Sequence, residues 1–446
     1  MPLSEAQILE LAPDAAAAKS GKDLANAIAK WKNMGCDETA IWGQCQGSGK
    51  DAYLTQVDIN NTAFKCSCPS RKFPCKHGIG LYLLYARQIA LFSEREQPAW
   101  VQEWISKRIA KSEQIAPNNA TISAEKAEKQ AKDKEKRAAQ RNEKVQNGIN
   151  ELNLLLKDLV RGGLLSFQSK APSFWSEKAA HLVDAQASGI ANLLHEFKQI
   201  NYAAPNWQLL CMQQLSKLYL LANAYQNLDA LPQALQHDIK NLIGWSAKKE
   251  EIMNHPNATT ISDTWLVCGK QIEENTEQKI STQYIWLYGQ QSQQYALLLD
   301  FATPFSPFSY FLVPNTAQEA TLTFYPSAAP FRALLHDNAQ TNPFAYPSHL
   351  YPNFETMGNA YAQRLSLQPF ADKIPFWVKQ INISKHQNYW YGYDQNGLYI
   401  PLHAQFEKIY TLLALSGGMP CDMCLIYYQQ QIIPLGIWAN EQYEVI

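Results

Sequence analysis

The fold of the N-terminal part of this chain is decided by residues 64–77, which read FKCSCPSRKFPCKH. Four residues of metal-ligand type fall within twelve positions of this stretch, and they are Cys66, Cys68, Cys75 and His77. On a strand, residues two apart project from the same face, so the first two cysteines can reach one ion. Pro69 and Pro74 bound a short loop that turns the chain back. The last two ligands then begin a helix over 76–91, where the helix dipole favours a thiolate.

Three thiolates and one imidazole form a closed tetrahedral set, which is the arrangement of structural zinc. We therefore expect one Zn²⁺, which would supply on the order of 10 kcal/mol of folding free energy to a hairpin and a helix with little core of their own. Four protein ligands leave no position for a reactive water, so we expect no hydrolysis at this site. The alternative is four unrelated Cys and His residues that share a buried corner.

The residues around the motif predict a small module of about residues 38–90 inside an N-terminal region, 1–115. Two helices are expected over 4–33, the second starting after a capping-box-like Ser20-Gly21-Lys22-Asp23. Alternating residues over 53–59, a turn at Asn60-Asn61 and a strand over 62–68 predict a β-hairpin. The order is helix, hairpin, helix.

The spacing C-x-C, six residues, C-x-H, with an apolar helix after it, resembles the SWIM zinc-finger family. The upstream stretch WGQCQGSGK at 42–50 is similar to the bacterial branch of SWIM-containing proteins. The resemblance covers roughly residues 38–90. It implies a zinc-binding module that binds DNA or protein partners and, for bacterial members, an association with AAA+ ATPases.

Basic residues surround the ligands, and residues 62–92 contain no Asp or Glu. The candidate contacts for a nucleic acid or protein partner are Lys65, Arg71, Lys72 and Lys76. Four interleaved aromatic residues can stack on bases or pack on a partner, and they are Phe64, Phe73, Tyr82 and Tyr85. Alternatively, the basic side chains only offset the charge of about −1 that three thiolates give a zinc site.

The remainder of the chain divides by composition. Residues 116–147 predict a charged helical linker, because 124–146 hold eight Lys or Arg and five Asp or Glu without an apolar stripe. Leucines spaced three and four apart predict a helical region over 148–257. Residues 258–446 are rich in aromatic and β-branched residues and predict a mixed, largely β domain. The expected fold class is α+β and multidomain.

Composition bounds the function. A formal net charge of −1 argues against a protein whose whole surface binds nucleic acid. A hydrophobic fraction of 46% argues against a chain that is disordered throughout. We find no basic, apolar leader at the start of the chain and no apolar run long enough for a bilayer, so a cytoplasmic protein with reduced thiols and no membrane partner is expected.

Two other motifs resemble functional sites only in part. Residues 43–50 miss the spacing and the hydroxyl of a Walker A loop, and Cys421-x-x-Cys424 predicts buried structural thiols. We find no catalytic signature and identify no small-molecule substrate, so the sequence predicts an adaptor and not an enzyme. The competing hypothesis is an enzyme with an unrecognised active site in residues 258–446, to which the zinc module delivers substrate.

Overall fold

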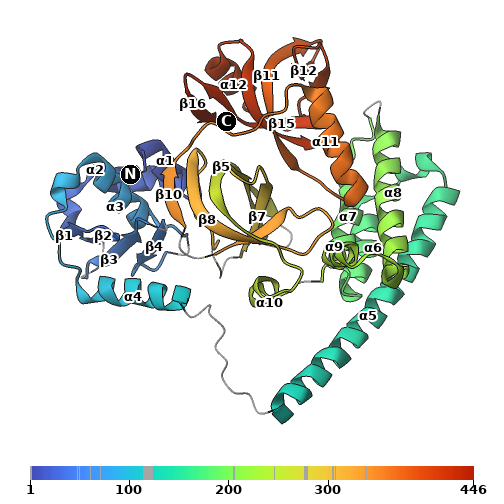
Figure 1. Ribbon diagram of the computed structural model, residues 1–446, viewed down its shortest axis with the longest axis horizontal. Helices are drawn as coiled ribbons and strands as arrows, with labels where there is room; N and C mark the ends of the chain where they lie inside the picture. The colour runs from blue at the N-terminus through green and yellow to red at the C-terminus, as the bar shows by residue number, and fades with distance from the viewer. Residues whose placement is uncertain are drawn as a thin grey trace.

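The computed structural model describes residues 3–47, 49, 51–60, 62–70, 72–113, 124–203, 206–245, 247–275, 280–303, 306, 308–336 and 339–446, without the side chains of 109–135. Figure 1 shows a small N-terminal module on one side, a β-rich region in the middle and above, and a helical bundle on the other side. The α+β class with these three parts agrees with the prediction. None of the helices in the described part of the chain has both the length and the apolarity needed to cross a bilayer.

The N-terminal module is a four-stranded antiparallel sheet with helices on both faces, in the strand order β1-β2-β3-β4. Its elements are α1 (Glu5–Glu10), α2 (Ala15–Asn26), β1 (Trp31–Cys36), β2 (Ala40–Cys45), β3 (Tyr53–Asp58), β4 (Ala63–Cys66), α3 (Lys76–Arg87) and α4 (Ala99–Glu113). The core under α3 includes Ile41 and Val57, whereas Trp42 points to the opposite face and packs with Val101 of α4. Successive residues of β2 therefore pack against helices on opposite faces of the sheet.

Two local predictions in this module were wrong. The second helix begins at Ala15, because Asp14 caps it by accepting the Ala17 N–H at 2.7 Å, so Ser20–Asp23 lie inside α2. The helix also ends at Asn26 and gives way to β1, a strand that the sequence pattern did not reveal. A bulge between Lys32 and Gly35 interrupts the alternation of β1, which explains why periodicity missed it.

Helix α3 crosses α2 at two glycines, and this close crossing gives the zinc ligands a rigid base. A Cβ on Gly21 would lie 2.6 Å from Ile79 Cγ2, and one on Gly80 would lie 3.2 Å from the Gly21 carbonyl oxygen. Every residue of α3 from His77 to Leu84 is buried. Because α3 is enclosed on all sides, it needs no polar face, and its apolar residues are spread around the helix and not confined to one face.

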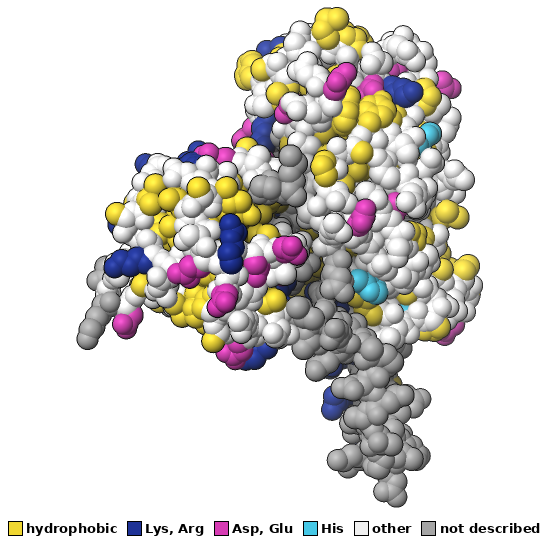
Figure 2. Space-filling model, turned by 60° about the vertical axis from the view of Figure 1, so that its left-hand side comes forward, with side chains coloured by type: hydrophobic (Ala, Val, Ile, Leu, Met, Phe, Trp, Pro, Cys, Tyr) yellow, Lys and Arg dark blue, Asp and Glu magenta, His cyan; other side chains and the backbone are white. Residues whose placement is uncertain are grey.

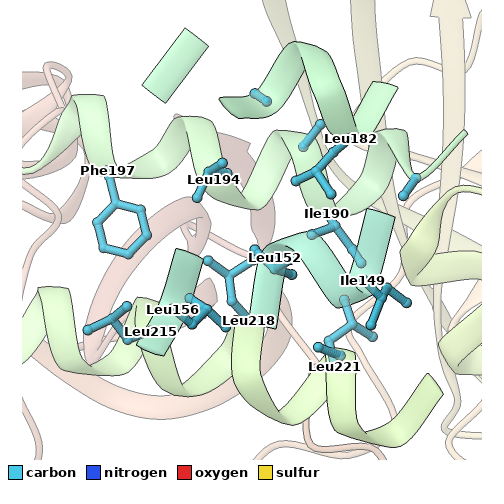
Figure 3. Packing of buried hydrophobic residues seen from close by; sticks show 14 of the residues in the cluster. Ile149, Leu152, Leu156, Leu182, Ile190, Leu194, Phe197, Leu215, Leu218 and Leu221 are labelled. Atoms are coloured by element: carbon cyan, nitrogen blue, oxygen red, sulfur yellow. The ribbon is translucent and has the colours of Figure 1, made fainter. Parts of the chain in front are cut away.

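The middle of the chain forms a helical bundle made of α5 (Ala124–Arg161), α6 (Pro172–Asp184), α7 (Ser188–His195), α8 (Trp207–Gln226), α9 (Gln233–Ile243) and α10 (Lys249–Met253). Figure 3 shows its core, where leucines of α5 such as Leu152 and Leu156 meet Leu218 of α8. Helix α5 runs through position 147 without interruption, and the guanidinium of Arg141 lies over the Trp245 ring. The domain boundaries remain predictions.

Two six-stranded sheets form the C-terminal region. The first contains β5 (Thr260–Asn275), β6 (Ile280–Gly289), β7 (Tyr295–Ala302), β8 (Thr316–Phe324), β9 (Arg332–Leu335) and β10 (Gln340–Pro343). The second contains β11 (Ile374–His386), β12 (Tyr389–Tyr393), β13 (Tyr399–Pro401), β14 (Cys421–Tyr428), β15 (Gln431–Ala439) and β16 (Gln442–Val445).

A shared apolar core joins the two sheets face to face. It includes Trp286 of the first sheet and Trp377 and Ile426 of the second. Helices α11 (Phe354–Leu367) and α12 (Ile409–Ser416) cover the far face of the second sheet. Cys421 belongs to the core under these helices and Cys424 to the core between the sheets, so the two thiols point to opposite faces of β14.

Candidate metal centre

The structure brings all four predicted ligands together at the end of β4 and the start of α3. Cys66 ends β4, Cys68 follows it, Cys75 is the N-cap of α3, and His77 lies in the first turn. Their ligand atoms all lie within 4.8 Å of one another. His77 Nδ1 is 3.8 Å from Cys66 Sγ and 3.9 Å from Cys75 Sγ.

These separations fit a zinc ion. With Zn–S bonds of about 2.3 Å and Zn–N bonds of about 2.0 Å, a tetrahedral site places sulfur and nitrogen roughly 3.5 Å apart. The observed separations exceed that value by only a few tenths of an ångström. The donor set of three sulfurs and one imidazole also suits zinc and not a hard, oxygen-seeking cation.

Several neighbours support the ligands without binding the ion themselves. Thr55 of β3 is fully buried, and its Oγ1 lies 3.3 Å from Cys66 Sγ. The Tyr53 ring packs against the His77 ring with 4.9 Å between centroids. Gly78 allows Phe64 to approach, since a Cβ there would lie 2.8 Å from Phe64 Cδ1. Such outer contacts orient ligands and tune their affinity for metal.

The electrostatics of the site favour a bound cation. Hydrogen bonding with Cys66 lowers the pKa of the Cys68 thiol and raises the pKa of the Cys75 thiol, because sulfurs this close cannot all ionise unaided. Burial opposes protonation of His77, but hydrogen bonds with Cys66 and Cys68 outweigh it and raise the pKa of His77 to about 9. A divalent ion would compensate all three thiolates at once.

The other cysteines of the module are not ligands. Burial raises the pKa of Cys45 to about 11, so this thiol stays protonated in the core of the module. Cys36 is buried in the same core, and its sulfur lies 2.9 Å from Nη1 of Arg95. Both residues are therefore small core residues of the module.

The basic residues near the site differ in their surroundings. Lys65, Lys72 and Lys76 are all exposed, whereas Arg71 lies outside the described residues. Lys72 pairs with Asp14 at 2.6 Å, so an acidic partner exists although residues 62–92 contain none. On the face shown in Figure 2, Lys and Arg side chains of the N-terminal module are interspersed with Asp and Glu and with hydrophobic residues.

The four aromatic residues considered for base stacking are engaged inside the protein. Phe64 and Tyr82 are buried in the module core, and the Tyr85 ring packs edge-on against Phe92. The Phe73 ring meets Phe311, 5.5 Å away, and Phe64 meets the same ring at 6.2 Å. Phe311 belongs to the loop between β7 and β8, so the β-rich region reaches into the zinc module. No local pattern in the sequence marks Phe311 or Thr55 for these positions.

Two family models match parts of this chain. Residues 53–86 match the SWIM zinc finger, a span that contains all four ligands. Residues 140–243 match the SWIM-associated four-helix bundle domain, a span that runs from the second half of α5 to the end of α9. No curated protein and no solved structure matches the chain significantly.

Proposed function

Because this chain is a SWIM-containing protein, we propose that it is an adaptor whose zinc module binds an anionic partner surface while the rest of the chain offers a second interaction surface. The observation that carries the proposal is the closed Cys₃His set at the junction of β4 and α3, with exposed lysines beside it. Zinc is then structural, because all four coordination positions belong to the protein. Reduced thiols are needed to bind it, and this need supports the cytosol as the compartment that we propose for the adaptor.

Two lysines form the proposed contact. Lys65 directly precedes Cys66 on β4, and Lys76 lies between Cys75 and His77 in the first turn of α3. Both side chains are exposed, and the metal fixes the backbone that carries them. Lys72 contributes less to this surface because Asp14 already neutralises it.

The chemistry of this contact is electrostatic. The four aromatic rings that could stack on bases, Phe64, Phe73, Tyr82 and Tyr85, pack against other residues of the protein, which disfavours base stacking by them. Two lysines can pair with carboxylates on a protein such as an AAA+ ATPase. Binding to a DNA duplex, in contrast, becomes tight only with many phosphate contacts. We therefore favour an acidic protein surface as the partner and keep DNA as the second candidate.

The second interaction surface that we propose is a face of β12 and β13. Cross-strand pairing puts Tyr391 opposite Pro401 and Tyr393 opposite Tyr399, while the alternate residues Trp390 and Ile400 pack under the helices. Tyr389 and Tyr399 are exposed, and none of the four tyrosines joins a hydrophobic cluster of described residues. Exposed tyrosine on a rigid strand is a common protein-recognition surface, and this supports an adaptor.

For the enzyme hypothesis we consider a polar cluster of described residues, where the bundle meets the β-rich region. Lys373 Nζ lies 2.5 Å from Glu273 Oε1 and 4.3 Å from the centre of the Tyr284 ring. Burial raises the pKa values of Asp372 and of Glu196 from the bundle. Because charges of both signs face one another here, we interpret the cluster as an ion-pair network that holds the bundle in place, and we propose no catalysis.

The proposal is tested by reversing the two contact lysines in the full chain. Tagged parent protein, the Lys65→Glu/Lys76→Glu variant and a Lys72→Ala control are purified with their native partners, and zinc content is measured in each. We expect a partner that is retained by the parent and the control but lost from the double variant, with zinc present throughout. A labelled DNA duplex is titrated in parallel at several salt concentrations.

Each outcome separates the possible roles. If DNA is the partner, each lost phosphate contact should flatten the slope of log affinity against log salt by about 0.9. Loss of zinc from the double variant would mean that the lysines only offset the charge of the thiolates. A double variant that keeps every protein partner and binds DNA as the parent does would refute the contact surface.

A further inference from the structure

Helix α8 carries an uncovered seam of residues with the spacing of a coiled coil. Positions 209, 212, 216, 219 and 223 repeat every three and four residues, and all five are exposed in the full chain. They are Leu209, Met212, Ser216, Tyr219 and Asn223. Its three large apolar members are Leu209, which is 51% exposed, Met212, which is 47% exposed, and Tyr219, which is 61% exposed. The opposite face of α8 packs into the bundle core through Leu218.

The solvent face of this helix has no charge. Over its 20 residues α8 contains one charged residue, Lys217, which is half-buried and lies off the seam, near Glu196. The flanking exposed positions include Gln208, Leu220 and Gln226, which are uncharged as well. Exposed helix faces in soluble proteins normally carry charged residues. An exposed face that is apolar and uncharged indicates a surface that is buried in an interface with another molecule.

We propose that this seam is the interface at which two copies of the chain form an antiparallel, two-fold symmetric dimer. A two-fold axis midway between Met212 and Ser216 places each Met212 against the small Ser216 of the other copy. The same axis places each Leu209 against Tyr219 of the other copy. Every layer then joins one large residue to a smaller or complementary one, and Asn223 falls outside the contact. A parallel pair would instead oppose Ser216 to Ser216 and Asn223 to Asn223.

The absence of charge favours a second copy as the occupant, and the small area limits the strength of the contact. An uncharged face meets its own copy without repulsion, whereas a charged partner helix would find no counter-charge on the seam. The exposed apolar side chains amount to roughly 400 Å² per copy, so the seam alone supplies about two thirds of the lower bound of about 1,200 Å² for a stable interface. The dimer should therefore form at micromolar concentrations and dissociate on dilution.

The test measures the molar mass of the zinc-loaded full chain by sedimentation equilibrium, from about 1 to 100 µM. Leu209→Lys alone should leave a monomer, because two lysines would be buried against tyrosine. Adding Tyr219→Glu to Leu209→Lys should restore the dimer, since the introduced lysine then faces the introduced glutamate of the other copy only in the antiparallel arrangement. The matched control is Val183→Lys, an apolar residue 48% exposed on α6 and off the seam. Circular dichroism confirms that each variant is folded.

The expected result is a parent dimer, a Leu209→Lys monomer, a restored dimer in the double variant and an unchanged control. A parent chain that stays monomeric across the range overturns the proposal and leaves the seam for a helix of another protein. A dimer that Leu209→Lys does not weaken also overturns it, because the contact then lies elsewhere. A double variant that stays monomeric excludes the antiparallel pairing.

Discussion

Replacing Thr55 with Val should weaken zinc binding although Thr55 is not a ligand. Its hydroxyl lies 3.3 Å from Cys66 Sγ, and its side chain is fully buried, so no water can take its place. When Cys66 is a thiolate, the hydroxyl donates to the sulfur, and a hydrogen bond to a charged group is worth about 1.5–3 kcal/mol. Valine has nearly the same shape and suits a strand, so the change removes the hydrogen bond and little else.

The magnitude follows from that contact. Removing an outer partner of a metal ligand costs about 10–100-fold in affinity, or about 1.4–2.7 kcal/mol, which agrees with the loss of one hydrogen bond to a thiolate. The Thr55 hydroxyl is also 3.5 Å from the Tyr53 carbonyl oxygen, a longer contact that the metal-free protein can use instead. Because that contact is long and weak, its loss should cost the metal-free Val variant little stability.

The assay is competition for zinc against a chromogenic chelator at pH 7 under reducing conditions. The parent should hold a single zinc ion, and Thr55→Val should release it at a chelator concentration about 10–100 times lower. Thr55→Ser is the matched control, because it keeps the hydroxyl and should bind zinc like the parent. Equal zinc affinities of the Val variant and the parent, within twofold, would refute the reasoning, as would a Ser control that is as weak as Val.

Two further predictions concern contacts of the N-terminal module. Phe311→Ala should lower the free energy of unfolding by about 2 kcal/mol, roughly half the cost for a fully buried Phe, because its half-buried ring packs on Phe73 and Phe64. Denaturant titration measures this loss, and Ala at the exposed Tyr410 should change the free energy of unfolding little. Equal losses in the two variants would contradict the prediction. Burial tends to raise the pKa of Asp37, but hydrogen bonds from the Thr39 and Ala40 backbone outweigh burial and hold it below its usual value. The stability that Asp37 contributes is thus present above about pH 4 and is lost as pH falls through its lowered pKa. Asp37→Ala should therefore reduce the melting temperature at pH 7 but not in acid. The same reduction in melting temperature at about pH 2 would contradict this prediction.

Much of the metal centre can be predicted from the sequence, because its signals are local. Cys66, Cys68, Cys75 and His77 lie within twelve positions, and strand and helix geometry alone can bring such close neighbours to one ion. The helix that contains His77, the hairpin that ends at Cys66 and the helical and β-rich parts of the chain follow from the same short-range periodicity.

Tertiary structure decided the features that depend on residues far apart in the chain. Lys72 meets Asp14, Phe73 meets Phe311, and the Thr55 hydroxyl meets Cys66 only after the strands and helices have packed. The apolar pattern of α8 likewise indicates a helix but does not say which of its apolar residues face the core and which form the exposed seam. Spacing determines local geometry, whereas burial and pairing depend on which distant surfaces come together.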